Sequence, residues 1–300
     1  MTISTITKNI LLTPFNVLYR INPKIDLKLL FRLKQGYKLD LKNPRTFNEK
    51  IQWIKLYDRN PLMPKCVDKY TVRKYVEEKG CKEILNELLW QGYHPEDIPY
   101  DALPNKFVIK VTHGSTFNII CTDKSKLDKK KVIKKINKWL NMHFLPCYGE
   151  WFYGIEKPRI VVEKYLESKD GLKDYKVYCF NGEPKVIGVF SNRFGKQMYE
   201  EMYNCNWKEE EGKTSNCPNP PIKTKKPKKL HDIILYSKKL SEDFNHVRVD
   251  FYIEDETIIF GELTFTDGSG FDKFSSKAYD EKLGDYLILK NANGFGDIND

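Results

Sequence analysis

Charged and hydroxyl side chains on two neighbouring predicted strands give the clearest chemical signal in this sequence. Residues 247–264 predict two short strands joined by a polar turn. Because side chains alternate across a strand, Arg248 and Asp250 share one face, and Glu262 and Thr264 share one face of the next strand. If the two faces coincide, the oxygen ligands suit Mg²⁺ that carries a nucleotide phosphate. An ordinary hairpin with exposed acids is the alternative.

A second segment has the character of a phosphate-binding turn. Residues 105–121 predict a strand, a turn rich in glycine, serine and threonine, and a second strand. Backbone N–H groups in such a turn, here at Gly114 and Ser115, can bind phosphate, with Lys110 beside them as a point charge. The glycine spacing fits neither a Walker loop nor a dinucleotide-binding fingerprint.

Six motifs follow one another in a characteristic order along the chain. They are Val67-Asp68-Lys69, Phe107–Lys110 with Gly114-Ser115, Ile160–Leu166, Asp174-Tyr175-Lys176, Arg248-Val249-Asp250 and Glu262-Leu263-Thr264. This order resembles the ATP-grasp superfamily, which includes D-alanine–D-alanine ligase and other carboxylate–amine ligases. Three further segments, 47–50, 174–184 and 261–265, resemble its TupA-like branch, which is associated with bacterial teichuronopeptide and capsular polysaccharide loci. The resemblance covers roughly residues 45–290.

The resemblance implies a nucleotide site built from both halves of the chain. Lys69 and Lys110 are expected to contact the α- and β-phosphates of ATP, and the loop with Gly114 and Ser115 to close over them. Glu163 is expected to bind the adenine amino group, and the backbone of Lys164, Tyr165 and Leu166 to form the hinge. Asp174 is expected to reach the ribose, and Lys176 a phosphate.

The resemblance also implies the catalytic and metal-binding residues. Asp250 and Glu262 are expected to hold Mg²⁺, with Thr264 as a further oxygen ligand. The superfamily usually ends this motif in Glu-x-Asn, so the threonine makes a second metal site less certain. Arg248 and Lys110 are the predicted catalytic residues, and Arg248 is expected to stabilise the transferring phosphoryl group and the tetrahedral intermediate.

Composition restricts the partners without deciding among them. The formal charge of +10 and the pI near 9.0 favour an anionic partner, such as a nucleotide, a charged polysaccharide, a membrane surface or a nucleic acid. A lysine-rich helix is predicted at 123–140, but it lacks arginine and has no aromatic residue on its polar side, so we expect no nucleic acid partner. Seven cysteines without a Cys-x-x-Cys pair indicate reduced thiols and a cytoplasmic protein.

The order of predicted elements favours an α+β fold, because helices come first and mostly antiparallel strands with flanking helices follow. Breaks are expected at Pro14, Pro23 and Pro44, and one helix at 67–79. The resemblance implies a two-lobed ATP-grasp clamp with an N-terminal helical extension at 1–65. The small lobe would span 66–167 with the phosphate loop and hinge, and the large lobe 168–300 with the metal site. The polar tail 291–300 is expected to be frayed.

The N-terminal region leaves two alternatives open. The mildly apolar stretch 9–20 is too short and too interrupted for a transmembrane span. It is either a helix packed on the core or a peripheral contact with the inner face of the membrane. Four basic residues would assist the second alternative, namely Lys24, Lys28, Arg32 and Lys34.

The function favoured by these observations is an ATP-dependent carboxylate–amine ligase that forms an amide through an acyl phosphate. Its expected cofactors are ATP and Mg²⁺. Its expected partners are an anionic surface polysaccharide or sugar precursor and an amine donor. A glycosyltransferase is the first alternative, although the chain lacks an Asp-x-Asp pair at a strand end. A kinase that uses the same clamp on a sugar or lipid carrier, and a non-enzymatic binding protein, are the others.

Overall fold

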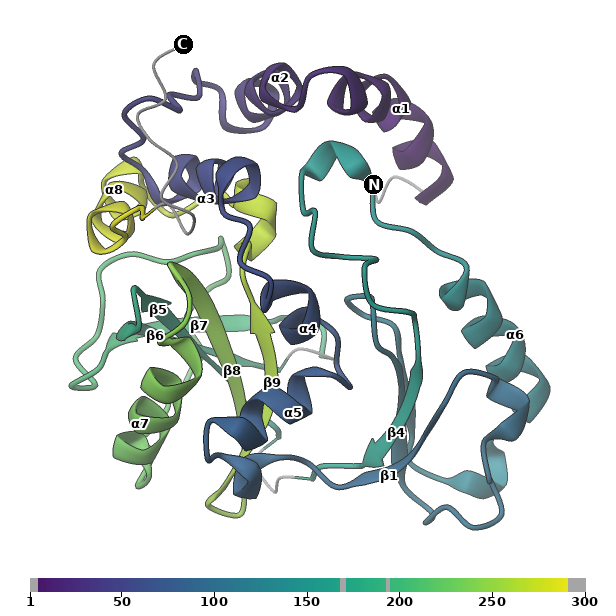
Figure 1. Ribbon diagram of the computed structural model, residues 1–300. Helices are drawn as coiled ribbons and strands as arrows, with labels where there is room; N and C mark the ends of the chain where they lie inside the picture. The colour runs from purple at the N-terminus through teal and green to yellow at the C-terminus, as the bar shows by residue number, and fades with distance from the viewer. Residues whose placement is uncertain (1–4, 168–170, 193–194, 291–300) are drawn as a thin grey trace.

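Two lobes, each with one antiparallel sheet, lie side by side beneath a pair of N-terminal helices (Figure 1). The computed structural model describes the backbone of residues 5–167, 171–192 and 195–290, and side chains from residue 11 onward. Its helices are α1 (Thr5–Ile21), α2 (Pro23–Gln35), α3 (Phe47–Tyr57), α4 (Met63–Val67), α5 (Val72–Glu78), α6 (Lys129–Leu140), α7 (Leu230–Ser241) and α8 (Lys277–Tyr286). Its strands are β1 (Leu88–Gly92), β2 (Phe107–Val111), β3 (Asn118–Cys121), β4 (Ile160–Lys164), β5 (Asp174–Phe180), β6 (Glu183–Ser191), β7 (Tyr199–Asn204), β8 (His246–Glu254) and β9 (Thr257–Thr264).

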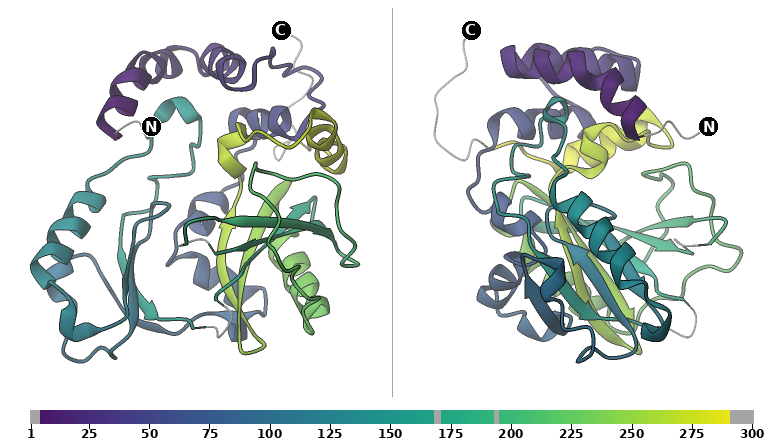
Figure 2. Two further views of the ribbon diagram at one scale, coloured as in Figure 1. Left: turned by 180° about the vertical axis from the view of Figure 1, so that it is seen from behind. Right: turned by 90° about the vertical axis from the view of Figure 1, so that its right-hand side faces the viewer.

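The smaller lobe holds a four-stranded sheet with the order β1-β4-β2-β3. Helix α6 covers one side of it (Figure 2), and begins where the Asp128 side chain accepts a hydrogen bond from the backbone N–H of Lys131 at 3.0 Å. Val132, Ile136 and Trp139 form the buried stripe of α6, as its periodicity predicts. The lysines of this helix therefore lie on its solvent side.

The larger lobe holds a five-stranded sheet with the order β7-β6-β5-β8-β9. Every residue of the central strand β5 is buried. The turn between β5 and β6 has positive φ at Asn181 and Gly182 (50° and 82°), as a two-residue hairpin loop requires. The α+β class, the antiparallel sheets and the N-terminal helices are thus confirmed.

Helix α3 joins the larger lobe through the last helix of the chain. The Asn48 side chain donates to Asp280 at 2.9 Å, and Lys50 Nζ donates to the carbonyl oxygens of Gly284 and Leu287 at 2.8 and 2.7 Å. Residues of α3, α4 and α5 share one hydrophobic core with the five-stranded sheet. The expected boundaries near residues 65 and 167 stay predictions.

Two local expectations are wrong. The predicted helix at 67–79 is broken, because α4 ends at Val67 and α5 begins at Val72. Between them the Asp68 carboxylate accepts from the backbone N–H groups of Tyr70 and Thr71, both at 2.9 Å, a local bond that competes with helix formation. Pro14 does not break the first helix but lies inside α1, at an exposed position.

Strands β1 and β7 have no counterpart in the sequence-based expectations. Both lie at sheet edges, where short strands with weak alternation form through pairing with a neighbour. No helix within residues 5–167, 171–192 and 195–290 is long and apolar enough to cross a membrane. The tail 291–300, expected to be frayed, lies outside the described residues.

Candidate active site

Two cavities bring most of the predicted site residues together. The first measures about 680 Å³, and five predicted nucleotide-binding residues line it, namely Lys110, Glu163, Lys164, Tyr165 and Leu166. The second measures about 250 Å³, and six other predicted residues line it, namely Lys69, Gly114, Ser115, Arg248, Glu262 and Thr264. Asp174, Lys176 and Asp250 are not among the lining residues of either cavity.

The predicted polar faces of β8 and β9 lie on the same side of the sheet. Arg248 pairs with Thr264 across the ladder, and Asp250 pairs with Glu262. A register shift follows between Asp250 and Phe251, and a Cβ atom at Gly261 would lie 3.0 Å from the Asp250 carbonyl oxygen. The bulge therefore requires a glycine there, because the backbones approach closely.

Arg248 connects the acids of this face. Its Nε donates to Asp250 at 2.6 Å and its Nη2 to the Thr264 hydroxyl at 3.1 Å, while Nη1 donates to Asp267. Burial lowers the pKa of Arg248, but the charges of Asp250 and Asp267 outweigh burial and raise it well above its ordinary value. The guanidinium is thus a fixed cation with its planar donors already oriented.

Asp267 is a site residue that the sequence motifs missed. It is buried and also lies 3.0 Å from Nε2 of His246, whose Nδ1 lies 2.9 Å from the Cys179 carbonyl oxygen. Burial opposes ionisation of Asp267, but Arg248 and His246 lower its pKa below the ordinary value. The Asp267-Gly-Ser-Gly turn directly after β9 was the available signal, since polar residues at a strand end commonly line sites.

Lys176 lies between two carboxylates. Its Nζ is 2.9 Å from Asp174 and donates to Asp250. Asp174 is only 1% exposed, so its expected contact with a ribose stays a prediction. Burial raises the pKa of Asp250, and the bonds from Arg248 and Lys176 oppose that shift.

Glu262 is an accessible carboxylate on the same face of the hairpin as Arg248. Its side chain is 42% exposed and lies 3.8 Å from both Lys69 Nζ and Arg248 Nη2. Burial would raise the pKa of Glu262, but the surrounding cations, with Lys69 the strongest, lower it to about 2. The side chain is thus ionised at neutral pH and free to accept a cation.

The predicted phosphate loop is tied to the linker between α4 and α5. Lys69 Nζ donates to the Gly114 carbonyl oxygen at 2.9 Å, and the backbone N–H of Val111 donates to Phe117 at 2.9 Å to close the loop. A Cβ atom at Gly114 would meet the Phe117 ring at 2.1 Å. Glycine is therefore required at the loop tip because the aromatic ring packs directly on it.

Lys110 and Glu163, expected at opposite ends of the nucleotide, are in contact. Lys110 Nζ lies 2.5 Å from Glu163, because β2 and β4 are neighbours with Val108 opposite Glu163. Arg73 lies 3.8 Å from the other Glu163 oxygen. The sequence did not predict Arg73 as a site residue, because this contact depends on α5 lying next to β4. The acid is thus charge-compensated before any ligand arrives.

The remaining walls of the second cavity come from segments without a recognised motif. Phe144, Glu150 and Tyr153 precede β4, and Thr266 and Ser269 follow β9. Glu150 accepts a hydrogen bond from Thr266 Oγ1 at 2.5 Å. Burial raises the pKa of Glu150, although the nearby Lys55 charge opposes this shift. Glu150 reaches the cavity through the fold, and no sequence motif marks it.

The family follows from a comparison of the sequence with known families. The family described as TupA-like ATPgrasp matches residues 49–288. The chain belongs to the TupA-like ATP-grasp family. No curated protein is matched by its sequence. Membership of this ATP-grasp family accounts for the order of motifs along the chain.

Several solved ligase structures are similar to part of this chain. L-amino acid ligase from Bacillus licheniformis is 15% identical with a TM-score of 0.47, over 74% of this chain and 49% of that one. D-alanine–D-alanine ligase from Bacillus anthracis, solved with ATP, is 16% identical with a TM-score of 0.41, over 67% and 55%. That from Helicobacter pylori is 14% identical with a TM-score of 0.42, over 80% and 69%. The chain thus spans about half the length of the first two, and the similarities assign no role to a side chain.

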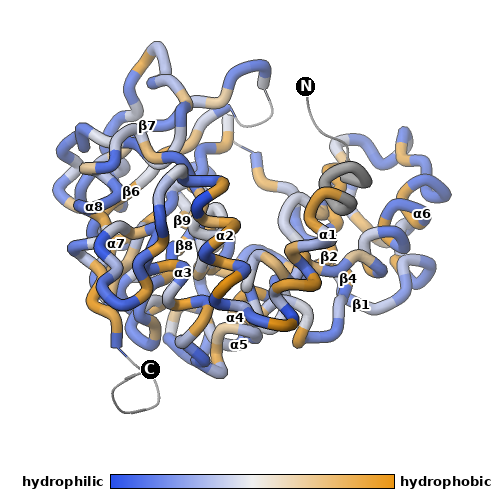
Figure 3. The backbone as a smooth tube through the Cα atoms, turned by 90° about the horizontal axis from the view of Figure 1, so that it is seen from above, coloured by the Kyte–Doolittle hydropathy of each residue, from blue (hydrophilic) through white to orange (hydrophobic). Residues whose placement is uncertain are grey.

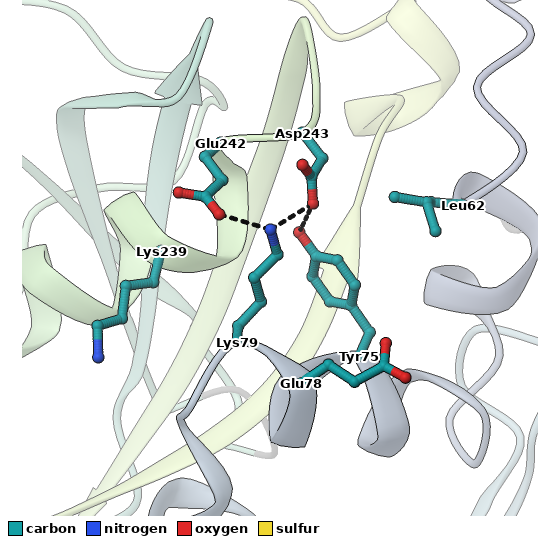
Figure 4. A pocket seen from close by; sticks show the side chains of 7 residues that line it. All are labelled: Leu62, Tyr75, Glu78, Lys79, Lys239, Glu242 and Asp243. Carbon is teal, nitrogen blue, oxygen red and sulfur yellow. Dashed lines mark hydrogen bonds and ion pairs between the residues drawn. The ribbon is translucent and has the colours of Figure 1, made fainter.

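A third cavity of about 390 Å³ holds none of the predicted ATP-grasp residues (Figure 4). Lys79 lies 2.5 Å from Glu242 and 2.6 Å from Asp243, and the Tyr75 hydroxyl donates to Asp243 at 3.0 Å. These bonds connect α5 to the segment after α7. The polar side chains thus pair with one another across this cavity, which is a junction between α5 and the segment after α7.

Proposed function

We propose that this chain is an ATP-dependent ligase that joins a carboxylate to an amine while a bacterial surface polysaccharide or its precursor is built in the cytoplasm. Two features support this proposal. The family is that of TupA-like ATP-grasp proteins, and its motif residues line two cavities, one with Lys110 and Glu163 and the other with Arg248 and Glu262. The second feature carries the proposal, because one cavity has the residues expected to bind a nucleotide and the other has the residues expected to assist phosphoryl transfer.

The larger cavity suits the adenosine part of ATP. Val108, Ile120, Leu172 and Tyr252 contribute apolar surface to its lining, and β4 ends at Lys164. A flat base can pack between such side chains while the backbone after β4 binds its edge. The phosphates would then reach Lys110 and Lys69, which have lysine's three rotatable donors.

The residues present fit Mg²⁺ through Glu262, an ionised and accessible oxygen ligand. Asp250 fits only after a rearrangement, because Arg248 and Lys176 already donate to both of its oxygens. Within the described residues, no group of three or more histidine, cysteine, aspartate or glutamate side chains is gathered for a metal. Bound Mg²⁺ would neutralise phosphate charge and polarise the transferred group.

In the proposed reaction a carboxylate oxygen attacks the γ-phosphorus of ATP, the bond to the bridging oxygen breaks, and ADP leaves. An amine then attacks the acyl carbon, phosphate leaves, and the amine nitrogen loses a proton to form the amide. Arg248 supplies oriented donors for the phosphoryl oxygens as their charge develops. The chain contributes mainly positioning and charge, which suits a site of lysines, one arginine and acids.

Glu150 would bind the amine substrate. It lines the same cavity as Arg248 and Glu262. It belongs to none of the predicted metal-binding motifs, so its carboxylate is available for another ligand. An ammonium group is stabilised by a partly buried carboxylate, and a carboxylate with a raised pKa is a suitable acceptor for the proton that the amine loses. Glu150→Gln should therefore raise the KM for the amine at least tenfold, as loss of a charged hydrogen bond implies, with the affinity for ATP unchanged in calorimetry.

The decisive experiment combines nucleotide binding with trapping of the acyl phosphate. Calorimetry should show binding of ATP with Mg²⁺ and no comparable binding of a UDP-sugar. ADP release should be measured over a panel of amino acids and uronic acids, with hydroxylamine replacing the amine, since acyl phosphates form hydroxamates.

The two enzymatic alternatives predict different results. UDP-sugar binding as tight as that of ATP would instead favour the glycosyltransferase. ADP release with a phosphate ester that resists hydroxylamine, and no need for an amine, would favour the kinase.

A further inference from the structure

Helices α1 and α2 present a row of apolar side chains to solvent at one end of the molecule. In α2 the exposed residues Ile25, Leu29 and Leu33 recur every four positions, so they lie on one face of the helix. Leu33 is 71% exposed, and Ile21 at the end of α1 is 76% exposed. Figure 3 views this end from above and shows apolar segments in both helices. Single exposed apolar residues are ordinary, but an aligned row indicates a contact surface.

A row of basic side chains borders the apolar row. Lys24, Lys28 and Arg32 are exposed and each directly precedes one of the apolar residues of α2. Residues 1–39 contain seven lysine and arginine residues and one acid, Asp26. Asp26 is fully buried, so the exposed charged side chains described in this segment are all basic.

The other face of these helices is anchored to the protein. Leu27, Leu30 and Phe31 are buried in a small core with Leu39 and Phe271. Among the described residues, this packing leaves the exposed row uncovered. It is held in a fixed orientation by a packed helix, which is the arrangement of an amphipathic surface helix.

The same helices are connected to the wall of the second cavity, where Glu150 is proposed to bind the amine. The backbone N–H of Cys147 donates to the Asn16 side chain of α1 at 3.1 Å, and Lys34 of α2 lies 5.1 Å from the centre of the Tyr148 ring. Phe144 and Glu150, on either side of this segment, line the cavity. A surface bound by α1 and α2 would thus lie close to the place where an acceptor enters.

We propose that the α1–α2 face, defined by Ile21, Ile25, Leu29, Leu33 and the basic row Lys24, Lys28 and Arg32, docks on an anionic phospholipid surface. The apolar row enters the headgroup boundary, and the basic row contacts lipid phosphates. This interaction does not depend on the proposed ligase chemistry.

Charge decides between a membrane and a second copy of the chain. A symmetric dimer through this face would set two copies of the same basic row against each other, which costs energy. An anionic bilayer instead attracts each lysine and arginine near its surface. The apolar row and the basic row therefore favour the same occupant.

The test is binding of the full-length chain to vesicles at about 0.15 M salt, where exposed charges more than about 8 Å apart are screened. Vesicles of phosphatidylcholine alone are compared with vesicles that also contain phosphatidylglycerol. The chain should sediment with the second kind. Lys24→Gln/Lys28→Gln should weaken binding about 30-fold, since each charge contributes about fivefold. Leu29→Ser/Leu33→Ser should weaken it at least tenfold.

The matched control is Lys130→Gln/Lys134→Gln on α6, where the same charge is lost from two exposed lysines four positions apart. It should bind within about twofold of the original chain, because α6 lacks an exposed apolar row. Circular dichroism and ATP affinity should be unchanged in all three variants, because the altered side chains are exposed.

Three results would overturn the proposal. The first is equal binding to neutral and anionic vesicles, or none. The second is an α6 variant as impaired as the α2 charge variant, which would mean that net charge alone is responsible. The third is a lipid-free dimer in sedimentation velocity that Leu29→Ser/Leu33→Ser converts to a monomer, which would make a second copy the occupant of the face.

Discussion

Lys69 donates a hydrogen bond to the carbonyl oxygen of Gly114 at 2.9 Å, although 45 residues separate them along the chain. One bond thus connects the linker between α4 and α5 to the loop between β2 and β3. The same ammonium group lies 3.8 Å from Glu262. Lys69 therefore holds the loop and faces Glu262, the proposed Mg²⁺ ligand, at the place proposed for the phosphates of ATP.

Lys69→Met should raise the KM for ATP by about 10- to 100-fold, since a charged hydrogen bond contributes about 1.5–3 kcal/mol. The kcat should change less, because the contact is made before charge develops. Steady-state ADP release measures both constants. Lys65→Met, at an exposed lysine of α4, is the control and should leave both constants unchanged. A variant at Lys69 with an ordinary KM would remove this lysine from the phosphate site.

Arg248→Ala should lower kcat by about 10²–10³-fold, as loss of one preorganised donor does, with a smaller change in the KM for ATP. It should also destabilise the fold by about 3–5 kcal/mol, because Asp250 and Asp267 lose a buried partner. Arg248→Lys should recover part of both losses, since a lysine retains the charge without the planar fork. An unchanged kcat with a raised KM in a folded variant would show that Arg248 binds ground-state nucleotide only.

Glu262→Gln and Asp250→Asn should both abolish most turnover but differ in stability. Glu262 is partly exposed, so its amide should leave the melting temperature nearly unchanged and raise the Mg²⁺ concentration needed for activity. Asp250 is 2% exposed and neutralises Arg248 and Lys176, so its amide should cost stability as well. Thermal denaturation alongside ADP release separates the two. Near-normal turnover in both variants would mean that the hairpin acids serve structure only.

Asp26→Asn should stabilise the protein relative to the original chain as the pH rises from 5 to 8. Burial raises the pKa of Asp26 from 3.8 to about 7, and neither side-chain oxygen has a hydrogen-bond partner among the described residues. A raised pKa means that the folded state favours the protonated acid, so its stabilisation is complete below pH 3.8 and is lost as the pH rises to about 7. The difference in free energy of unfolding should thus shift by about 2–3 kcal/mol in favour of the variant.

Urea denaturation at both pH values measures this shift. Asp101→Asn, at a fully exposed side chain, should show no comparable change. A constant difference between Asp26→Asn and the original chain would indicate that Asp26 keeps an ordinary pKa.

The hairpin acids were predictable from sequence because a strand has a period of two and a short turn fixes its register. Arg248, Asp250, Glu262 and Thr264 therefore share a face as expected. The helix expected around Lys69 was wrong, because the Asp68 side chain replaces helical hydrogen bonds at that point. Side-chain competition of this kind leaves the hydrophobic periodicity of the segment intact, so the pattern does not reveal it.

Arg73 and Glu150 were not predictable as site residues. Each acquires its role from a neighbour distant in sequence, such as Glu150 from Thr266 and Arg73 from Glu163. A single sequence contains no signal for such pairs, because the contact depends on how two lobes and their connections pack. The resemblance to a family indicates the motif residues but not the other residues that line the cavities.

The bonds between α3 and α8 have a consequence for synthesis on the ribosome. Asn48 and Lys50 must wait for Asp280, Gly284 and Leu287 before their buried polar groups are satisfied. The core of the larger lobe therefore closes only when α8 has left the exit tunnel. Until then α3 exposes Phe47, Ile51 and Ile54, which are fully buried in the finished fold. Nascent chains that stop before α8 should consequently be retained by chaperones and degraded.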